Sequence, residues 1–186
     1  MRKIIGICGE TGSGKTTIID FLCKNYHLDK LVETTDRPKR ENETHEQYKF
    51  VSCKEFLDMI CDDMLVGVSM FKVKHEQKTF KYGFNISEIP QNGVYILQCN
   101  WQSLPRLEKY FKDEFVSIQI VRDDKQKMLS VLNRQNVNVY EACDRFCRDK
   151  KLYSELETDY IVYNDNKIDV VCKNIYNDII LRSWYL

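Results

Sequence analysis

Eight consecutive residues near the start of the chain combine glycines with a lysine and a threonine. They read Gly9-Glu10-Thr11-Gly12-Ser13-Gly14-Lys15-Thr16, which matches the pattern G-x-x-x-x-G-K-[ST] in full. Glycines let the backbone wrap around phosphate oxygens with its N–H groups, and the N-terminus of a helix adds positive charge. Lys15 is expected to reach the β- and γ-phosphates, and the Thr16 hydroxyl is expected to hold Mg²⁺. The segment is therefore predicted to bind nucleotide phosphates through Gly9, Thr11, Gly12, Ser13, Gly14, Lys15, Thr16 and Thr17.

The residues on either side of this loop predict the elements that must position it. Lys3 to Cys8 is a β-branched run typical of a strand buried on both faces, and residues 15 to 25 have the apolar spacing of a helix. Three further strands, each followed by a helical segment, are predicted at 93–99, 115–121 and 159–163. Alternating strands and helices indicate an α/β fold with a mostly parallel central sheet flanked by helices.

The overall charge argues against two classes of function. The chain has 186 residues, and 28 lysines and arginines balance 28 aspartates and glutamates, whereas proteins that coat nucleic acid or anionic membranes carry a basic excess. No apolar run approaches the roughly 18 residues that cross a bilayer. The apolar stretch after the basic N-terminus is too short for an export signal. We therefore expect a cytoplasmic protein, a monomer or a homodimer, that binds neither nucleic acid nor membrane.

The eight cysteines are scattered along the chain without a Cys-x-x-Cys pair. Several lie in apolar segments, as buried free thiols do. Cys143 and Cys147 share a helix face, but two ligands do not complete a zinc site. The cysteines are therefore predicted to be reduced thiols rather than disulfides or metal ligands.

A second set of motifs follows the phosphate loop. Residues 34–40 read T-T-D-R-P-K-R, residues 48–52 read Y-K-F-V-S, and Glu55-Phe56 come shortly after. These motifs resemble the guanylate kinase family, whose pattern here is roughly T-T-R-x-P-R, then Y-x-F-V-S and E-F. The resemblance extends over nearly the whole chain, in order, through Tyr82-Gly83, the arginines at 134 and 145, and the strand ending in Asn164-Asp165.

The resemblance implies a P-loop kinase fold with a small inserted lobe and a helical lid, in a single domain of residues 1–186. The ATP-binding core would comprise residues 1–33, 89–121 and 158–186. The lobe that binds the acceptor monophosphate would be 34–88, and the lid 122–157. The family transfers the γ-phosphoryl group of MgATP to GMP or dGMP. The resemblance thus implies ATP and Mg²⁺ as cofactors and a nucleoside monophosphate as substrate.

The same resemblance assigns roles to individual residues. Lys15 and two lid arginines, Arg134 and Arg145, would neutralise charge on the moving phosphoryl group. Asn164 would contribute to the ATP site. The acceptor would be bound by Thr34, Arg37, Lys39, Arg40, Tyr48, Tyr82 and Asn100.

The sequence departs from the family in the acceptor pocket. Asp36 replaces the first arginine of the motif, and Gly67 stands where the family has the glutamate that reads guanine. Phe84 replaces a serine or threonine. At the end of the strand predicted at 93–99, Gln98 and Asn100 stand where the family has acidic residues. The loss of polar groups that pair with a base is expected to relax or redirect the choice of base.

Two alternatives to a GMP or dGMP kinase therefore stay open. The first is a non-catalytic binding module, because guanylate kinase-like domains also hold partner peptides in the acceptor pocket, and a fold does not fix a function. The second is a kinase for a different or modified nucleoside monophosphate. The retained Lys15 and Thr16 favour turnover over the binding module.

Overall fold

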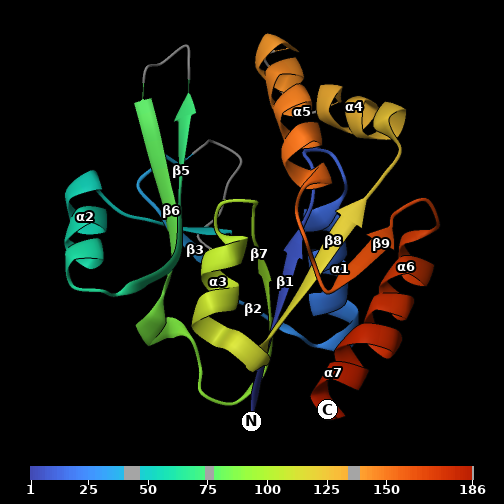
Figure 1. Cartoon of the computed structure of the whole chain (residues 1–186), viewed down its shortest axis with the longest axis horizontal. Helices are drawn as coiled ribbons and strands as arrows, with labels where there is room; N and C mark the ends of the chain where they lie inside the picture. Colours follow the sequence, from blue (N-terminus) through green and yellow to red (C-terminus); the bar gives the residue numbers. More distant parts are fainter. Residues whose placement is uncertain (40–46, 74–77, 134–138, 186) are drawn as a thin grey trace.

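The strands of the chain form two separate sheets that lie side by side (Figure 1). The computed structural model describes residues 1–39, 47–73, 78–133 and 139–185. The first sheet has the order β2-β7-β1-β8-β9, and its neighbouring strands are all parallel. This confirms the predicted α/β fold around a parallel sheet. Its strands are β1 (Arg2–Cys8), β2 (Asp29–Lys30), β7 (Gly93–Gln98), β8 (Phe115–Val121) and β9 (Tyr160–Tyr163).

Helices cover both faces of this central sheet. Along β1, Ile5 and Ile7 face α1 (Lys15–Tyr26) and α6 (Ile168–Asn174), whereas Ile4 and Cys8 face α3 (Leu104–Phe111). Alternate side chains of one strand thus enter two different apolar clusters, which is why the predicted run is apolar without interruption. A short 3₁₀ turn, η2 (Lys112–Glu114), leads from α3 into β8.

The C-terminal helical segment that follows β9 is not one regular α-helix. After α6, the chain makes a π-helical stretch, η3 (Ile175–Ile180), before α7 (Leu181–Tyr185). The wider turn keeps Ile175, Ile179 and Ile180 buried against the central sheet. Packing therefore overrides the 3.6-residue repeat at this point.

The second sheet forms the inserted lobe, with the strand order β4-β3-β6-β5. A helix, α2 (Cys53–Cys61), lies on its outer side (Figure 1) and begins with a capping box, in which Ser52 and Glu55 bond each other's backbone N–H. Val66, Phe84 and Ile89 anchor the lobe, because they share an apolar cluster with α3. The lobe comprises β3 (Glu33–Thr35), β4 (Tyr48–Phe50), β5 (Leu65–Val73), β6 (Lys78–Asn85) and η1 (Ile86–Glu88).

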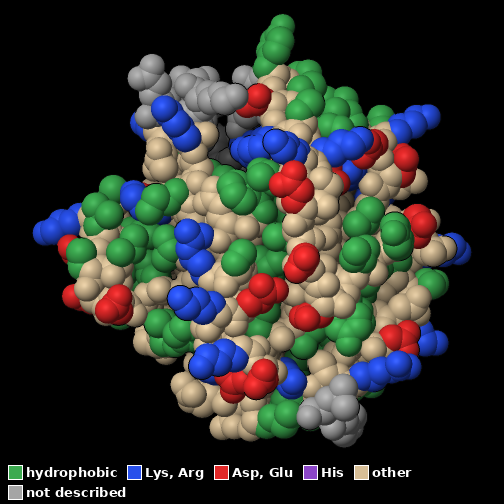
Figure 2. All heavy atoms as spheres, viewed as in Figure 1, with side chains coloured by type: hydrophobic (Ala, Val, Ile, Leu, Met, Phe, Trp, Pro, Cys, Tyr) green, Lys and Arg blue, Asp and Glu red, His purple; other side chains and the backbone are tan. Residues whose placement is uncertain are grey.

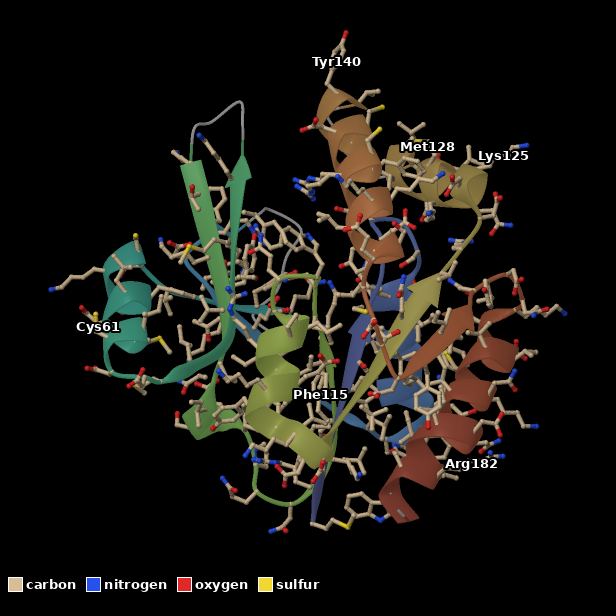
Figure 3. The ribbon with its side chains drawn as sticks, viewed as in Figure 1. Cys61, Phe115, Lys125, Met128, Tyr140 and Arg182 are labelled. Atoms are coloured by element: carbon tan, nitrogen blue, oxygen red, sulfur yellow. The ribbon has the colours of Figure 1, made fainter. Side chains whose placement is uncertain are left out.

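Two helices, α4 (Asp124–Leu132) and α5 (Val139–Ser154), stand together above the parallel sheet, beyond its carboxyl edge (Figure 1). Tyr153 at the end of α5 is buried in the core, whereas Tyr140 at the other end is 89% exposed and points away from the molecule (Figure 3). The pair is thus anchored at the end nearest the phosphate loop and projects into solvent at the other.

The state of the cysteines and the lengths of the helices complete the description of the fold. All eight cysteines are free, with Cys8, Cys99 and Cys172 buried and Cys61 exposed on α2 (Figure 3). Within the described ranges, every helix is too short or too polar to reach across a bilayer.

Candidate active site

The phosphate loop connects the end of β1 to the start of α1, as its sequence predicts. Gly9, Gly12 and Gly14 all have positive φ, at 143°, 85° and 95°. A Cβ on Gly12 would lie 2.5 Å from the carbonyl oxygen of Lys127, and one on Gly14 would lie 2.4 Å from the side-chain amide of Asn164. Glycine is therefore required for two reasons here, the backbone conformation and the lack of space.

Three side chains from distant parts of the sequence hold this loop in shape. Asp149 on α5 accepts hydrogen bonds from the amide and the hydroxyl of Thr11, at 3.1 and 2.6 Å. The amide of Asn164, after β9, donates to the carbonyl oxygen of Ser13 at 2.8 Å. The ammonium of Lys127 on α4, which is 2% exposed, pairs with Glu10 at 2.6 Å.

Sequence reasoning missed Asp149, Lys127 and Glu10, because no motif marks a contact between positions more than 100 residues apart. It placed Asn164 among the ATP contacts. In the structure the Asn164 amide supports the backbone of the loop, and a direct contact with ATP stays a prediction.

The Lys15 ammonium and the Ser13 hydroxyl both point into the loop rather than to solvent. The ammonium of Lys15 donates to the carbonyl oxygens of Gly9 and Glu10, at 2.7 and 2.8 Å. The hydroxyl of Ser13 is fully buried and has no hydrogen-bond partner among the described residues. A buried hydroxyl without a partner costs free energy, so a ligand oxygen that reaches the loop would satisfy it. The loop therefore fits a polyphosphate.

Thr16, the predicted ligand of Mg²⁺, contacts the side chain of Gln98. The hydroxyl of Thr16 donates to the side-chain oxygen of Gln98, at 3.1 Å. Both groups are oxygen ligands of the kind that Mg²⁺ accepts, and Mg²⁺ commonly keeps several waters alongside one or two protein ligands. The described residues contain no cluster of three or more acidic, histidine or cysteine side chains that could hold a metal by themselves. The donor set therefore fits a Mg²⁺ that arrives with a nucleotide.

The inserted lobe places a buried arginine against aromatic rings. Arg37 is 7% exposed, and its guanidinium lies over the rings of Tyr48 and Phe50, at 5.3 and 5.6 Å from their centres. The Arg37 guanidinium also donates to the carbonyl oxygen of Pro38 at 2.9 Å. Tyr82 meets Tyr48 edge to face. Three predicted substrate residues, Arg37, Tyr48 and Tyr82, are therefore brought together.

The remaining residues predicted to bind the acceptor are Thr34, Lys39, Arg40 and Asn100. Thr34 is buried, and its hydroxyl has no hydrogen-bond partner among the described residues. Lys39 is exposed, while Arg40 lies outside the described residues. The amide oxygen of Asn100 accepts from the backbone N–H groups of residues 102 and 103, and its amide nitrogen donates to Ser69 at 3.1 Å. Asn100 thus joins the core to the lobe, and its predicted contact with the acceptor stays untested.

Two positions at which the sequence departs from the family pattern, Gly67 and Phe84, pack against the core. Gly67 lies at a bulge in β5 with φ of 64°, and a Cβ there would lie 2.7 Å from the side chain of Leu107. Phe84 is 1% exposed and packs in the same cluster as Leu107. The core helix α3 therefore fills the space where a longer side chain from position 67 would begin.

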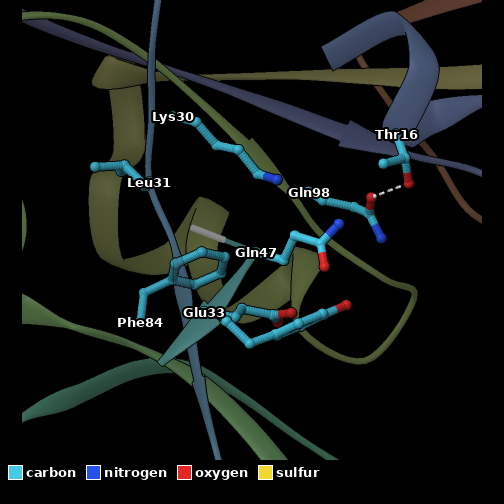
Figure 4. A pocket seen from close by; sticks show the side chains of 8 residues that line it. Thr16, Lys30, Leu31, Glu33, Gln47, Phe84 and Gln98 are labelled. Atoms are coloured by element: carbon cyan, nitrogen blue, oxygen red, sulfur yellow. Dashed lines mark hydrogen bonds between the residues drawn. The ribbon is translucent and has the colours of Figure 1, made fainter. Parts of the chain in front are cut away.

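A cavity of about 250 Å³ lies between the phosphate loop and the inserted lobe (Figure 4). Glu33 lines it and was not among the predicted site residues. Burial raises the pKa of the Glu33 carboxyl to about 8, although nearby Lys30 acts in the opposite direction. The lining residues are Thr16, Lys30, Leu31, Glu33, Gln47, Tyr48, Phe84 and Gln98.

Helix α5 contributes basic side chains to the same region. Arg145 is partly buried on α5, and Arg148 one turn later pairs with Asp149 at 2.9 Å. The guanidinium of Arg148 also lies 5.9 Å from the ring centre of Phe71 on β5, so α5 reaches toward the lobe. Arg134 lies outside the described residues. Figure 2 shows lysine and arginine side chains gathered between the lobe and α5 on this face.

Comparisons with known proteins agree with this arrangement. The family model described as guanylate kinase matches residues 1–180. The chain is similar to the crystal structure of guanylate kinase from Anaplasma phagocytophilum, with a TM-score of 0.71, 21% identity, and coverage of 98% of this chain and 86% of that one. It is also similar to the protein TT1252 of Thermus thermophilus, with a TM-score of 0.54, 11% identity, and 97% of each chain covered. No curated protein sequence matches significantly.

Proposed function

Because the chain belongs to the guanylate kinase family, we propose that it is a nucleoside monophosphate kinase that transfers the γ-phosphoryl group of ATP to the phosphate of the acceptor. One observation carries the proposal. Thr16, at the start of α1, and Tyr48, from the acceptor lobe, line one cavity. Two nucleotides held by these two parts of the chain would meet with their phosphates facing, as direct transfer requires.

Different residues would bind ATP, bind the acceptor and neutralise charge on the transferred group. The phosphate loop would bind the ATP polyphosphate with backbone N–H groups and the Ser13 hydroxyl. Arg37 would hold the acceptor phosphate, and the partly buried Arg145 would neutralise charge on the transferred group. Bound Mg²⁺, held by Thr16 with Gln98 beside it, would neutralise the β- and γ-phosphates.

Lys15 would have to change partners during this cycle. Its ammonium now bonds the carbonyl oxygens of Gly9 and Glu10. An arriving triphosphate offers negatively charged oxygens, which make stronger hydrogen bonds to an ammonium than neutral carbonyls do. The side chain would therefore turn toward the phosphates when ATP binds.

The test is a panel of ribo- and deoxynucleoside monophosphates, each incubated with MgATP and purified protein, with diphosphate formation followed by chromatography. Lys15→Ala should lower turnover on every acceptor by about 10²–10³-fold, because it removes a donor to the reacting phosphates. Lys24→Ala is the matched control, since Lys24 is exposed in the last turn of the same helix. Formation of no diphosphate from any acceptor would defeat the proposal, and tight binding of ATP without turnover would favour the binding module.

A further inference from the structure

The carboxyl group of Glu33 has no role in the reaction proposed above. It begins β3, and its Oε1 atom is shielded from solvent without a hydrogen-bond partner among the described residues. A buried carboxyl without a partner destabilises the folded protein, so its presence calls for a reason. Glu33 lines the cavity between the phosphate loop and the lobe, where an arriving ligand can supply the missing partner.

The shape of this cavity separates a phosphate end from a base end. Thr16 and Gln98 lie beside the phosphate loop. Leu31 and Phe84 line another part of the wall, and Figure 4 shows the Glu33 carboxyl on the same side as Phe84. An acceptor nucleotide with its phosphate toward the loop would place its flat, apolar base against Leu31 and Phe84. The edge of that base would then meet Glu33.

Three positions at which the sequence departs from the family pattern offer no available polar side chain to a base edge, although the wall also carries the polar side chains of Lys30, Gln47 and Tyr48. Gly67 has no side chain, and Leu107 occupies the space beside it. Phe84 offers only a ring, and the amide of Asn100 is bonded to Ser69 and to the backbone. Among the described residues that line the cavity, Glu33 carries the only carboxyl group.

From this geometry we infer that Glu33 is a base-binding residue of the acceptor site, and that it pairs with the base edge as a neutral acid. A neutral carboxyl offers one donor, the O–H, beside one acceptor, the C=O. It therefore pairs with a base edge that presents one acceptor beside one donor. The inference rests on the proposed function, because it assigns the base end of that same acceptor site.

The surroundings of Glu33 support the neutral form. Apolar burial raises the pKa of Glu33 to about 8, so the proton is largely retained at neutral pH. The ammonium of Lys30 is the charged group that acts on Glu33, and its attraction does not offset the burial. Two further titratable groups are close, the Tyr48 phenol in the cavity wall and the Cys99 thiol, whose pKa burial raises well above its ordinary value.

The chemistry of the bases sets what such a site can and cannot distinguish. Adenine N1 and N6, cytosine N3 and N4, uracil or thymine N3 and O4, and guanine N1 and O6 each place one donor beside one acceptor. The guanine N1–H and N2 amino edge presents two donors, which an ionised carboxylate would accept and a neutral acid would not. The proposed site therefore makes no use of the guanine 2-amino group.

The experiment measures binding of monophosphates to the whole protein by calorimetry, so it does not depend on turnover. GMP and IMP differ by the 2-amino group, and at pH 7 we expect their Kd values to agree within about threefold. Glu33→Ala should weaken monophosphate binding about tenfold or more, because the base edge loses its partner. Glu33→Gln should keep most of the affinity, because its amide also has one donor beside one acceptor.

A change of pH gives a check on the wild-type protein alone. As pH rises through about 8, Glu33 loses its proton, so the Kd of the best monophosphate should increase, whereas Glu33→Gln should show no such rise. Asp58→Asn, exposed on α2 of the same lobe, is the control for a change of charge alone.

Three outcomes would overturn the inference: a tenfold advantage of GMP over IMP, equal losses in Glu33→Gln and Glu33→Ala, or no loss of monophosphate affinity in Glu33→Ala. None of these concerns turnover, so each is separable from failure of the kinase proposal. A protein that binds monophosphates through Glu33 but forms no diphosphate would keep this inference and lose the kinase.

Discussion

Asp36 and Lys81 form an ion pair across strands β3 and β6, with the carboxylate Oδ2 and the ammonium 2.5 Å apart. The second carboxylate oxygen accepts the backbone N–H of Lys81 at 2.7 Å. Asp36 stands where the family has an arginine, and its side chain is 3% exposed. The carboxylate therefore joins two strands of the acceptor lobe, which explains why the substitution is compatible with the fold.

Restoring the family residue at this position should harm the protein. Asp36→Arg would bury a second cation beside Lys81 and leave both unpaired, so we expect a loss on the order of 3 kcal/mol in the free energy of unfolding. Urea denaturation followed by circular dichroism measures this change. Asp58→Asn on the surface of the same lobe should shift stability by less than about 0.5 kcal/mol. A stable Asp36→Arg variant would show that the ion pair is dispensable.

Arg37 should act on the acceptor rather than on ATP. Its planar guanidinium stacks on Tyr48 and Phe50, and lysine lacks both this stacking and the bidentate donor geometry. Arg37→Lys is therefore expected to raise the KM for the monophosphate about tenfold and to leave the KM for ATP nearly unchanged. Steady-state kinetics with each substrate varied in turn measures both constants. Arg106→Lys, on the exposed side of α3, is the control, and an equal rise in both KM values would argue against the assigned role.

Asp149 should matter for ATP although it belongs to the lid. It bonds both the amide and the hydroxyl of Thr11, so its removal frees one turn of the phosphate loop. We expect Asp149→Ala to weaken ATP binding about tenfold, since lost hydrogen bonds to a charged group are worth about 1.5–3 kcal/mol. Calorimetric titration with ATP tests this, and Glu155→Ala, exposed just beyond α5, is the control. Unchanged ATP affinity in Asp149→Ala would mean that the loop holds its shape alone.

The raised pKa of Glu33 also predicts how stability depends on pH. Below the ordinary value of 4.5, both the folded and the unfolded protein keep the proton, and the group has no effect. Between that value and about 8, the unfolded chain releases the proton while the folded protein retains it, so stability falls as pH rises. Glu33→Gln cannot titrate. We therefore expect it to gain stability relative to the wild type from pH 5 to pH 8, as measured by urea denaturation at both values. A constant difference between the two proteins would contradict a raised pKa in the folded state.

The sequence predicted most of the elements because their signals are local. The β-branched run before Gly9 forms β1, and Ser52 with Glu55 forms the capping box that begins α2. The π-helical stretch Ile175–Ile180 was not predicted, because it follows from how the helix packs on the sheet and not from its own spacing.

The sequence by itself determined the phosphate-loop motif, and with it the prediction of a phosphate site, because the glycines, Lys15 and Thr16 are neighbours in the chain. Only the tertiary structure decided what surrounds them. Asp149 and Lys127 support the loop from the lid, and Glu33 comes to face Gln98 across a cavity. The physical reason is that burial and unmet hydrogen bonds are properties of packed surroundings, which residues distant in sequence create together.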